Sequence, residues 1–506
     1  MNWKVILRSL KHRDMQKRIA AVIGIVIVYR FLAHIPIPFG DPQTVKQVLD
    51  NLFSSDTTPQ LLNFLNIISG GALANFSIMV AGLGPYINAS IIMQLLTRAI
   101  PKLEQLRKDG ESGQKKINQY TRMLTFPLAI IQSIGAIYLI RQAAQSVSGV
   151  GDITADADVM QWVLMVAALT AGSMILMWLG EQVTEQSIGN GISLLITAGI
   201  VSALPTTFGS IASGIFGGDN KWHIFGTTIP VDPSGLIFLA IVVAVVIGMT
   251  WAVVKLNEGQ RRLTVNYAKR VQGNRTYGGV TTVLPIKLIT AGVIPIIFAV
   301  AFLSVPSFAG QLLSSSSSAQ LAELGQNLVV WFQAPSAQSL LQGGIDPFIY
   351  PVTYFSLVVL FTFFYTSITF NAKDIAENLQ KQGGFIEGVR SGAQTEKYLS
   401  TISRRLTLFG AISIGLLALV PIFAQLFIAA DVTLGGTGIL ILVTVSLEVL
   451  RAVESRALMI TYDQYASSDY FSGGEGGATL EEDKTDDDKP RRKFRIFPTR
   501  GKAVAH

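Results

Sequence analysis

Long apolar segments alternate with shorter polar ones along most of the chain. A helix needs about 20 predominantly apolar residues to cross a bilayer. Segments of about that length lie near 19–36, 82–100, 121–141, 159–180, 188–205, 235–256, 286–306, 350–370, 406–428 and 434–450. The pattern therefore predicts ten membrane-spanning helices. The first follows a basic stretch and lacks a small-residue cleavage site, so we expect it to stay in the mature protein.

One further apolar segment, from Leu61 to Ala81, differs from the spans because Ser69, Gly70 and Gly71 interrupt it. Glycine adopts backbone conformations that other residues avoid. We therefore expect a half-helix folded back into the protein. Such a segment needs burial, because irregular backbone at membrane depth must be covered by protein or face a cavity.

The polar connections differ in charge. Basic residues outnumber acidic ones in 1–18, 98–122, 257–287 and 372–405, whereas 142–158 and 307–349 contain acidic residues and no Lys or Arg. Because excess Lys and Arg marks the cytoplasmic side, this pattern with ten spans predicts that both termini are cytoplasmic.

Two of the basic connections carry patterns of folded structure. In 261–287 alternating apolar residues flank Gly273-Asn274, which predicts a β-hairpin. In 371–405 a short helix is expected over Asp374 to Lys381, ended by Gly383-Gly384. A second helix is expected from about Ser391–Thr395 into Arg404-Arg405. The basic residues could serve topology alone, but folded loops of this size favour a docking surface for a soluble cytoplasmic partner.

Two other segments have compositions typical of exposed, unstructured chain. Ser314 to Ser318 is a low-complexity stretch in the connection 307–349, for which we expect a flexible loop. The tail, 461–506, consists of glycines followed by blocks of acidic and then basic residues, which predicts disorder. It is either an inert solvated tail or a partner-binding arm.

Composition supports a membrane protein and excludes most site chemistry. Hydrophobic residues make up 50% of the chain and charged ones 14%, against about 25% charge in a typical soluble domain. The chain has 0 cysteines, and its 4 histidines show no metal-ligand spacing. Central turns of nearly every predicted span lack charged residues, and no paired carboxylates, Ser/His/Asp set or phosphate loop stands out. We therefore expect no catalytic residue, metal or cofactor.

A series of short motifs occurs in a fixed order over about residues 15–460. They are Ile35-Pro-Ile-Pro38, Ser69-Gly-Gly-Ala-Leu73, Pro85-Tyr-Ile-Asn-Ala-Ser-Ile-Ile92, Gln94-Leu-Leu96, Gly110-Glu-Ser-Gly113, Met177-Trp-Leu-Gly-Glu-Gln182, Gly189-Asn-Gly-Ile-Ser193, Gly259-Gln-Arg-Arg262, Asn266-Tyr-Ala-Lys-Arg270, Ala291-Gly-Val-Ile-Pro295 and Gly435-Gly-Thr437. Each motif alone is a weak signal, but the ordered set is specific. It resembles the SecY family, the channel-forming subunits of the bacterial protein translocase.

The resemblance implies an all-α polytopic membrane protein with ten transmembrane helices and a re-entrant plug helix. Two inverted five-helix halves, 1–206 and 207–460, would face each other like a clamshell hinged near 206–233. Unfolded secretory polypeptides would pass through the centre, and membrane-protein helices would leave sideways into lipid. Such a channel subunit is not an enzyme, and its energy would come from the SecA ATPase or the translating ribosome.

The resemblance also assigns roles to single residues. The pore ring would be Leu83, Ile87, Ile196, Ile297 and Ile441. The plug, over about 61–80, would include Ser69, Gly70, Gly71, Ala72 and Leu73, with Gly82 also permitting movement. Taken singly, each isoleucine is far more typical of a core or lipid-facing position, and only the resemblance selects it for the ring. The broken segment alone would equally fit a re-entrant packing element.

For the lateral gate, which the family has between its second and seventh spans, the resemblance selects Gln94, Ile289 and Thr290. Many relatives carry Asn where this chain has Ile289, so one interhelical hydrogen bond is expected to be missing. The resemblance assigns the docking of SecA or the ribosome to Arg261, Arg262, Lys269, Arg270 and Arg390.

Further implied partners are the SecE and SecG subunits, signal peptides, nascent chains and membrane lipids, with no DNA. The implied location is the bacterial inner membrane. Two other classes stay open from the residues alone: a secondary transporter, which should show a polar midplane site, and a membrane enzyme, which should show a catalytic constellation.

Overall fold

The computed structural model describes residues 12–37, 69–145, 158–216 and 222–467, apart from gaps at 74, 188, 225–226, 230–232, 268–269, 273–274, 278, 280, 291, 293, 315–317, 336, 342–343 and 425–435. Contacts divide the chain into two units, Met1–Leu458 and Met459–His506. In the second unit, the described part is the last helical stretch, which ends at Ser467.

Each of the predicted apolar segments contributes to a helix. These helices are α2 (Arg13–Leu32), α5 (Gly84–Ala99), α7 (Glu111–Gln145), α8 (Val159–Glu185), α9 (Gly191–Phe216), α10 (Pro233–Glu258), α11 (Ile294–Ser314), α14 (Asp346–Thr369), α16 (Ala393–Ala424) and α17 (Gly436–Ser467). By length and hydropathy, α8, α10, α14 and α16 each contain a segment able to cross a bilayer, and α9 and α11 contain shorter apolar stretches. The crossing of all ten stays a prediction.

Local sequence explains where several helices begin. Asp158 caps α8: its Oδ1 accepts a hydrogen bond from the Val159 amide at 2.7 Å, and Gln161 Oε1 accepts one from the Asp158 amide at 3.2 Å. Both α5 and α14 have proline in their first turn, where the missing amide hydrogen costs nothing.

Two predicted spans differ from the helices observed. The first ends at Leu32, because Pro36 and the residues beside it run extended. The seventh was expected from 286, but 281–287 is strand β6 (Thr281–Lys287), whose pairing continues as the Leu288 amide donates to Gly259 O at 2.8 Å. Sheet pairing therefore keeps residues 281–288 out of a helix, and α11 begins at Ile294, where Pro295 fits the first turn.

The connection 307–349 and the start of the C-terminal tail are more helical than expected. The connection 307–349 contains α12 (Ala319–Phe332) and the short α13 (Ala337–Leu341). Gly310 of α11 and Gly325 of α12 lie in contact, since a Cβ built at either would meet the other's carbonyl oxygen within 2.8 Å. The predicted tail boundary at 461 is wrong over 461–467, because α17 continues to Ser467. Ser315 to Ser317 and 468–506 lie outside the described residues.

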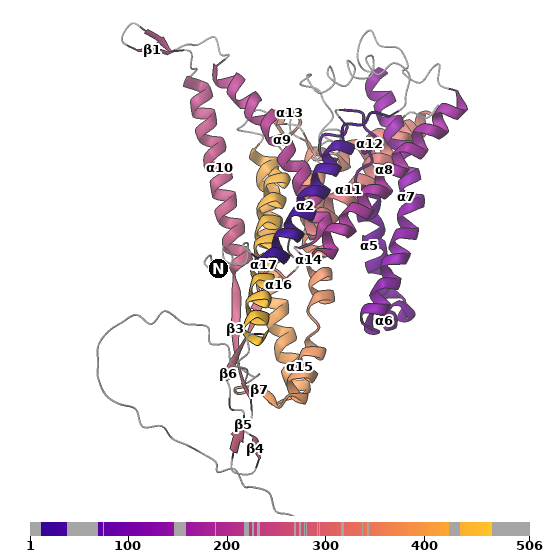
Figure 1. Ribbon diagram of the computed structural model, residues 1–506. Coiled ribbons are helices and arrows are strands. Elements are labelled where there is room, and N and C mark those ends of the chain that lie inside the picture. The colour runs from indigo at the N-terminus through magenta and orange to yellow at the C-terminus, as the bar shows by residue number, and fades with distance from the viewer. Residues whose placement is uncertain are drawn as a thin grey trace, which may run out of the picture. The chain divides into compact units, whose positions relative to one another are not determined.

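A small sheet follows α10, and it confirms the hairpin predicted in 261–287 (Figure 1). Strand β3 (Gln260–Tyr267) pairs antiparallel with β6 from Gln260–Lys287 to Asn266–Thr281, and with β7 (Gly384–Ile386) on its other edge. Between β3 and β6, β4 (Arg270–Gln272) pairs with β5 (Arg275–Tyr277), and the two residues that would form the turn lie outside the described ones.

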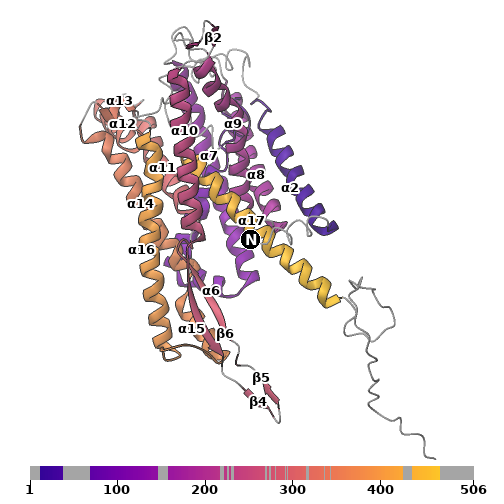
Figure 2. The ribbon, with the colours of Figure 1, turned by 90° about the vertical axis from the view of Figure 1, so that its left-hand side faces the viewer.

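The predicted helix at 374–381 is confirmed as α15 (Ala372–Lys381), beside the sheet and the start of α16 (Figure 2). These elements share a core of their own. It contains Leu263, Val265, Ile286, Leu379, Ile386, Leu399 and Ile402. A second hairpin, β1 (Trp222–Ile224) with β2 (Thr227–Ile229), lies between α9 and α10.

Charged side chains join helices far apart in the sequence. Arg98 of α5 donates to the carbonyl of Ser367, and Arg107 of α6 (Pro101–Lys108) donates to that of Ile368 at 3.4 Å. Both carbonyls belong to the last turn of α14, where a helix has unpaired acceptors and favours nearby cations.

Replacing Val265 by Asp should loosen the β3–β6–β7 sheet, whereas Thr264→Asp should not. Val265 is fully buried in the sheet's core, and a buried carboxylate costs roughly 2–5 kcal/mol. Thr264 is exposed. The measurement is the rate of trypsin cleavage at Arg261 and Arg262 in purified protein. Equal resistance of the two variants would show that this core does not hold the loop.

Candidate functional site

The predicted ring residues gather in the main hydrophobic core although they come from four helices. Leu83 and Ile87 are at the start of α5, Ile196 is in α9, Ile297 in α11 and Ile441 in α17. All except the half-buried Ile297 are buried in one cluster, and Ile297 packs against it. Ala72 and Met79 belong to the same cluster. The apolar ring and the predicted plug therefore share one packed interior.

Residues 69–83, here called the turn segment, form consecutive turns over their described part and not the predicted helix. Gly70, Gly71 and Gly82 have φ of +69°, +83° and +58°, which favours glycine. Internal hydrogen bonds, such as Ser77 N to Ala72 O at 2.9 Å, satisfy part of its backbone. Residues 61–68 lie outside the described chain.

Residues 35–37, which follow α2, pair with the turn segment as a short strand would. Pro36 forms an antiparallel bridge with Ser77. Ile78 N donates to Ile35 O at 3.0 Å, and Ile37 N donates to Phe76 O at 2.9 Å. The first motif, Ile35 to Pro38, thus supplies backbone partners to Phe76 and Ile78 of the turn segment.

Helix α8 packs directly on the turn segment at a glycine. A Cβ built at Gly172 would lie 2.0 Å from the carbonyl oxygen of Ile78, so glycine is required there. Ala72, Leu73 and Met79 are each at most 1% exposed. The turn segment is therefore covered by protein, as irregular backbone at membrane depth requires.

Three polar side chains that the sequence analysis missed hold the start of the turn segment. Tyr29 Oη donates to Ser69 O at 3.1 Å. Arg30 Nη1 donates to Gly70 O and, at 2.8 Å, to Ser202 Oγ. A charged residue inside an apolar span is itself a functional signal, and Arg30 in the first predicted span gave that signal.

At the predicted gate, Gln94 forms no interhelical hydrogen bond that the described structure shows. Its Nε2 donates to Ser90 Oγ at 3.1 Å within α5, and its Oε1 is buried without a partner. Ile289 and Thr290 lie in the non-helical stretch before α11, and Ile289 is buried. Gly292 in this stretch has φ +60°.

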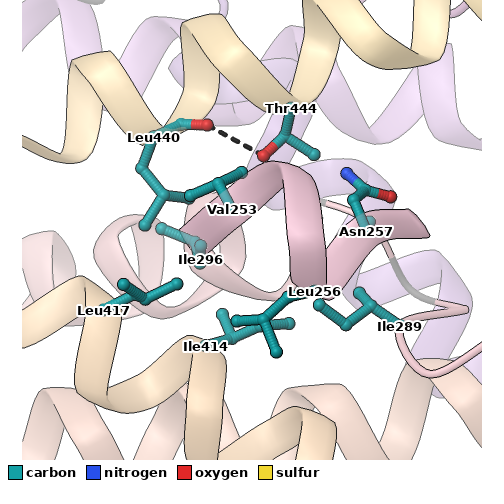
Figure 3. A pocket seen from close by; sticks show the side chains of 10 residues that line it. Val253, Leu256, Asn257, Ile289, Ile296, Ile414, Leu417, Leu440 and Thr444 are labelled. Atoms are coloured by element: carbon teal, nitrogen blue, oxygen red, sulfur yellow. Dashed lines mark hydrogen bonds between the residues drawn. The ribbon is translucent and has the colours of Figure 1, made fainter. Parts of the chain in front are cut away.

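A small cavity lies beside Ile289 (Figure 3). It is lined by Val253, Leu256, Asn257, Ile289, Gly292, Ile296, Ile414, Leu417, Leu440 and Thr444. Thr444 Oγ1 donates to Leu440 O at 2.9 Å in its own helix. Among the residues named above, the lining carries no charged group, and the buried Ile289 side chain forms part of it.

The predicted docking residues lie on or near the small sheet. Arg261 and Arg262 in β3 and Arg390 before α16 are exposed. Arg270 is in β4, and Lys269 and the Arg270 side chain lie outside the described part of the chain. Over the described residues, no group of His, Cys, Asp and Glu could hold a metal ion.

Comparison with known proteins gives a consistent result. The SecY family model matches residues 77–450. The chain is 40% identical over 463 residues to "Protein translocase subunit SecY" of Streptomyces galbus, covering 90% of this chain and 98% of that one. It is 37% identical to the protein of the same name from Mycobacterium bovis, covering 91% and 98%.

Solved structures share the fold. One described as "The structure of a protein conducting channel" matches with a TM-score of 0.53 and 18% identity, covering 89% of this chain and 93% of that one. Another, which reports that the plug domain of the SecY protein maintains a membrane seal, has a TM-score of 0.55 and 17% identity, covering 88% and 94%.

Gly172→Ala should lower the thermal unfolding midpoint in detergent, because its methyl group cannot fit against the Ile78 carbonyl. We expect a loss of about 1–3 kcal/mol, as for overpacked positions. Gly248→Ala in α10 is the matched control: a Cβ there meets nothing within 4 Å, and helix propensity favours alanine. An unchanged midpoint in Gly172→Ala would contradict the close packing of α8 on the turn segment.

Proposed function

The chain belongs to the SecY family of protein translocase subunits, and we propose how its residues form the protein-conducting channel of the Sec translocon. It is a membrane channel subunit and not an enzyme. The polypeptide passes between two halves, 1–206 and 207–460, that separate about a hinge near 206–233. Both termini are cytoplasmic.

The channel is narrowest at the ring of Leu83, Ile87, Ile196, Ile297 and Ile441. The observation that carries this proposal is that the five side chains, which come from four helices, meet in one apolar cluster, with four buried in it and Ile297 packed against it. Aliphatic side chains offer no fixed hydrogen-bond partners, so they suit a channel that must pass many different sequences. A narrow apolar throat also resists water and ions.

The turn segment, with Ser69 to Leu73, is the plug of the closed channel. It contributes Ala72 and Met79 to the cluster that contains the ring, which supports a position against the ring when no polypeptide is present. Opening moves it aside, and its glycines, which lack a Cβ and adopt positive φ in the closed position, allow its turns to rearrange.

Membrane-protein helices leave sideways at a gate formed by α5, the stretch before α11, and α14. Gln94, Ile289 and Thr290 line this gate. The buried Gln94 Oε1 without a partner supports a gate that lacks the interhelical hydrogen bond of many relatives. Arg98 and Arg107 bridge α5 and α6 to the end of α14, so these contacts must break when the gate opens.

The β3–β6–β7 sheet and the segments next to it form the docking surface for the partner that drives translocation. The residues that bind SecA or the ribosome are Arg261, Arg262, Lys269, Arg270 and Arg390. Guanidinium groups hold carboxylates or phosphates bidentately, and the Lys269 ammonium attracts the same groups as a point charge. SecE and SecG complete the complex in the bacterial inner membrane, and signal peptides and nascent chains are its substrates.

Replacing Ile87, Ile196, Ile297 and Ile441 together by Ser should raise ion conductance in planar bilayers without translocating substrate. Smaller polar side chains widen and wet the throat. The matched control replaces four exposed isoleucines by Ser, at Ile23, Ile27, Ile131 and Ile247. Deleting 64–73 should produce a milder leak, because neighbouring residues partly refill the space. A ring variant as tight as the parent would remove the ring assignment.

Arg390→Glu should slow SecA-driven transport into reconstituted vesicles while leaving the protein folded. Arg390 is exposed, so the reversal costs little stability, but it places repulsion at the docking surface. Lys116→Glu, an exposed reversal in α7, controls for charge alone. Parental transport rates in Arg390→Glu would exclude Arg390 from docking.

A further inference from the structure

Side chains from two helices converge on the backbone where the turn segment begins. Tyr29 and Arg30 of α2 bond to the carbonyl oxygens of Ser69 and Gly70. Ser202 of α9 accepts from Arg30 at 2.8 Å, and its own hydroxyl donates to Gly199 O at 2.6 Å. Arg30 therefore connects α2, α9 and the turn segment through one guanidinium group.

The backbones at this point are unusually close. A Cβ built at Gly70 would lie 3.0 Å from the Gly199 Cα and would overlap the Tyr29 hydroxyl. Ser69 is 1% exposed and Tyr29 is 2% exposed. Because the acceptors are main-chain carbonyls held against a glycine of α9, the contact fixes the position of the backbone rather than of a mobile side chain.

The turn segment also supplies a hydrogen-bond acceptor that the Arg30 guanidinium needs. Among the residues that the structure describes, no carboxylate forms an ion pair with Arg30. A carbonyl and a hydroxyl are its hydrogen-bond partners instead. Moving the turn segment away takes a carbonyl acceptor from the half-buried Arg30 guanidinium, which opposes the movement.

We propose that Arg30, supported by Tyr29 and Ser202, is the positioning residue that holds the turn segment in the closed channel. This rests on the proposed function of that segment as the plug. A polypeptide that opens the channel must break the Arg30 contact, so Arg30 sets how often the plug leaves in the absence of substrate.

The test uses the full chain with its translocase partners in planar bilayers. Arg30→Met keeps the length of the side chain and removes its donors, and it should raise the open probability at least about tenfold, as expected for lost hydrogen bonds to a charged group. The conductance of each opening should equal that of the parent's rare openings. Arg30→Lys should recover part of the closure, and Phe31→Met, 70% exposed on the same helix, should behave as the parent.

A second measurement reads the position of the segment without using ion flow. The chain has 0 cysteines, so Ser69→Cys gives a single thiol. Its alkylation by a water-soluble maleimide should be slow, because position 69 is buried, and should accelerate at least about tenfold when Arg30→Met is added. Phe31→Met should leave the rate unchanged.

The two measurements separate the proposals. If deletion of 64–73 causes a leak but Arg30→Met changes neither leak nor alkylation, Arg30 does not hold the plug and this inference fails. If Arg30→Met accelerates alkylation while neither it nor the deletion causes a leak, Arg30 holds the segment but the plug function fails. Faster alkylation together with more frequent openings supports both.

Discussion

The structure depends on one constraint, which is that irregular backbone inside an apolar helix bundle must have its polar groups bonded and covered by protein. The turn segment meets it in three ways. Its own turns bond part of the backbone, residues 35–37 bond another part, and Tyr29 and Arg30 bond the carbonyls of Ser69 and Gly70. Gly172 lets α8 cover it closely. In the proposed channel, a segment held by such few contacts stays in place when no polypeptide is present and moves aside when one enters.

A channel for polypeptides also needs a constriction with no preferred partner. In the proposed channel the ring residues supply it, because aliphatic groups seal by exclusion of water rather than by specific bonds. The proposed ring and the turn segment share one hydrophobic cluster, so displacement of the segment as proposed would remove packing from the ring itself. The non-helical stretch before α11 is also irregular backbone covered by protein. Ile289 is buried, and Gly410 of α16 lies against the Leu288 carbonyl.

Features governed by local sequence were predictable, and those governed by tertiary contacts were not. Apolar length located the helices, and alternation around Gly273-Asn274 located the sheet hairpin. The start of α11 was misplaced because β6 pairing outweighs the apolar signal after 286. Helix α12 was missed because it is shorter than a span. The contacts of Arg30 with Gly70 and Ser202 join positions 40 and 172 residues apart, which no local pattern encodes.

The central claim, that polypeptide passes through the ring, is tested most directly by photo-crosslinking. A photoreactive amino acid is placed at Ile196 or Ile441, and at Ile247 as an exposed position on α10, in translocons holding a stalled secretory chain. The account predicts adducts between the secretory chain and positions 196 and 441, and none with position 247. Adducts from position 247 but not from the ring positions would contradict it.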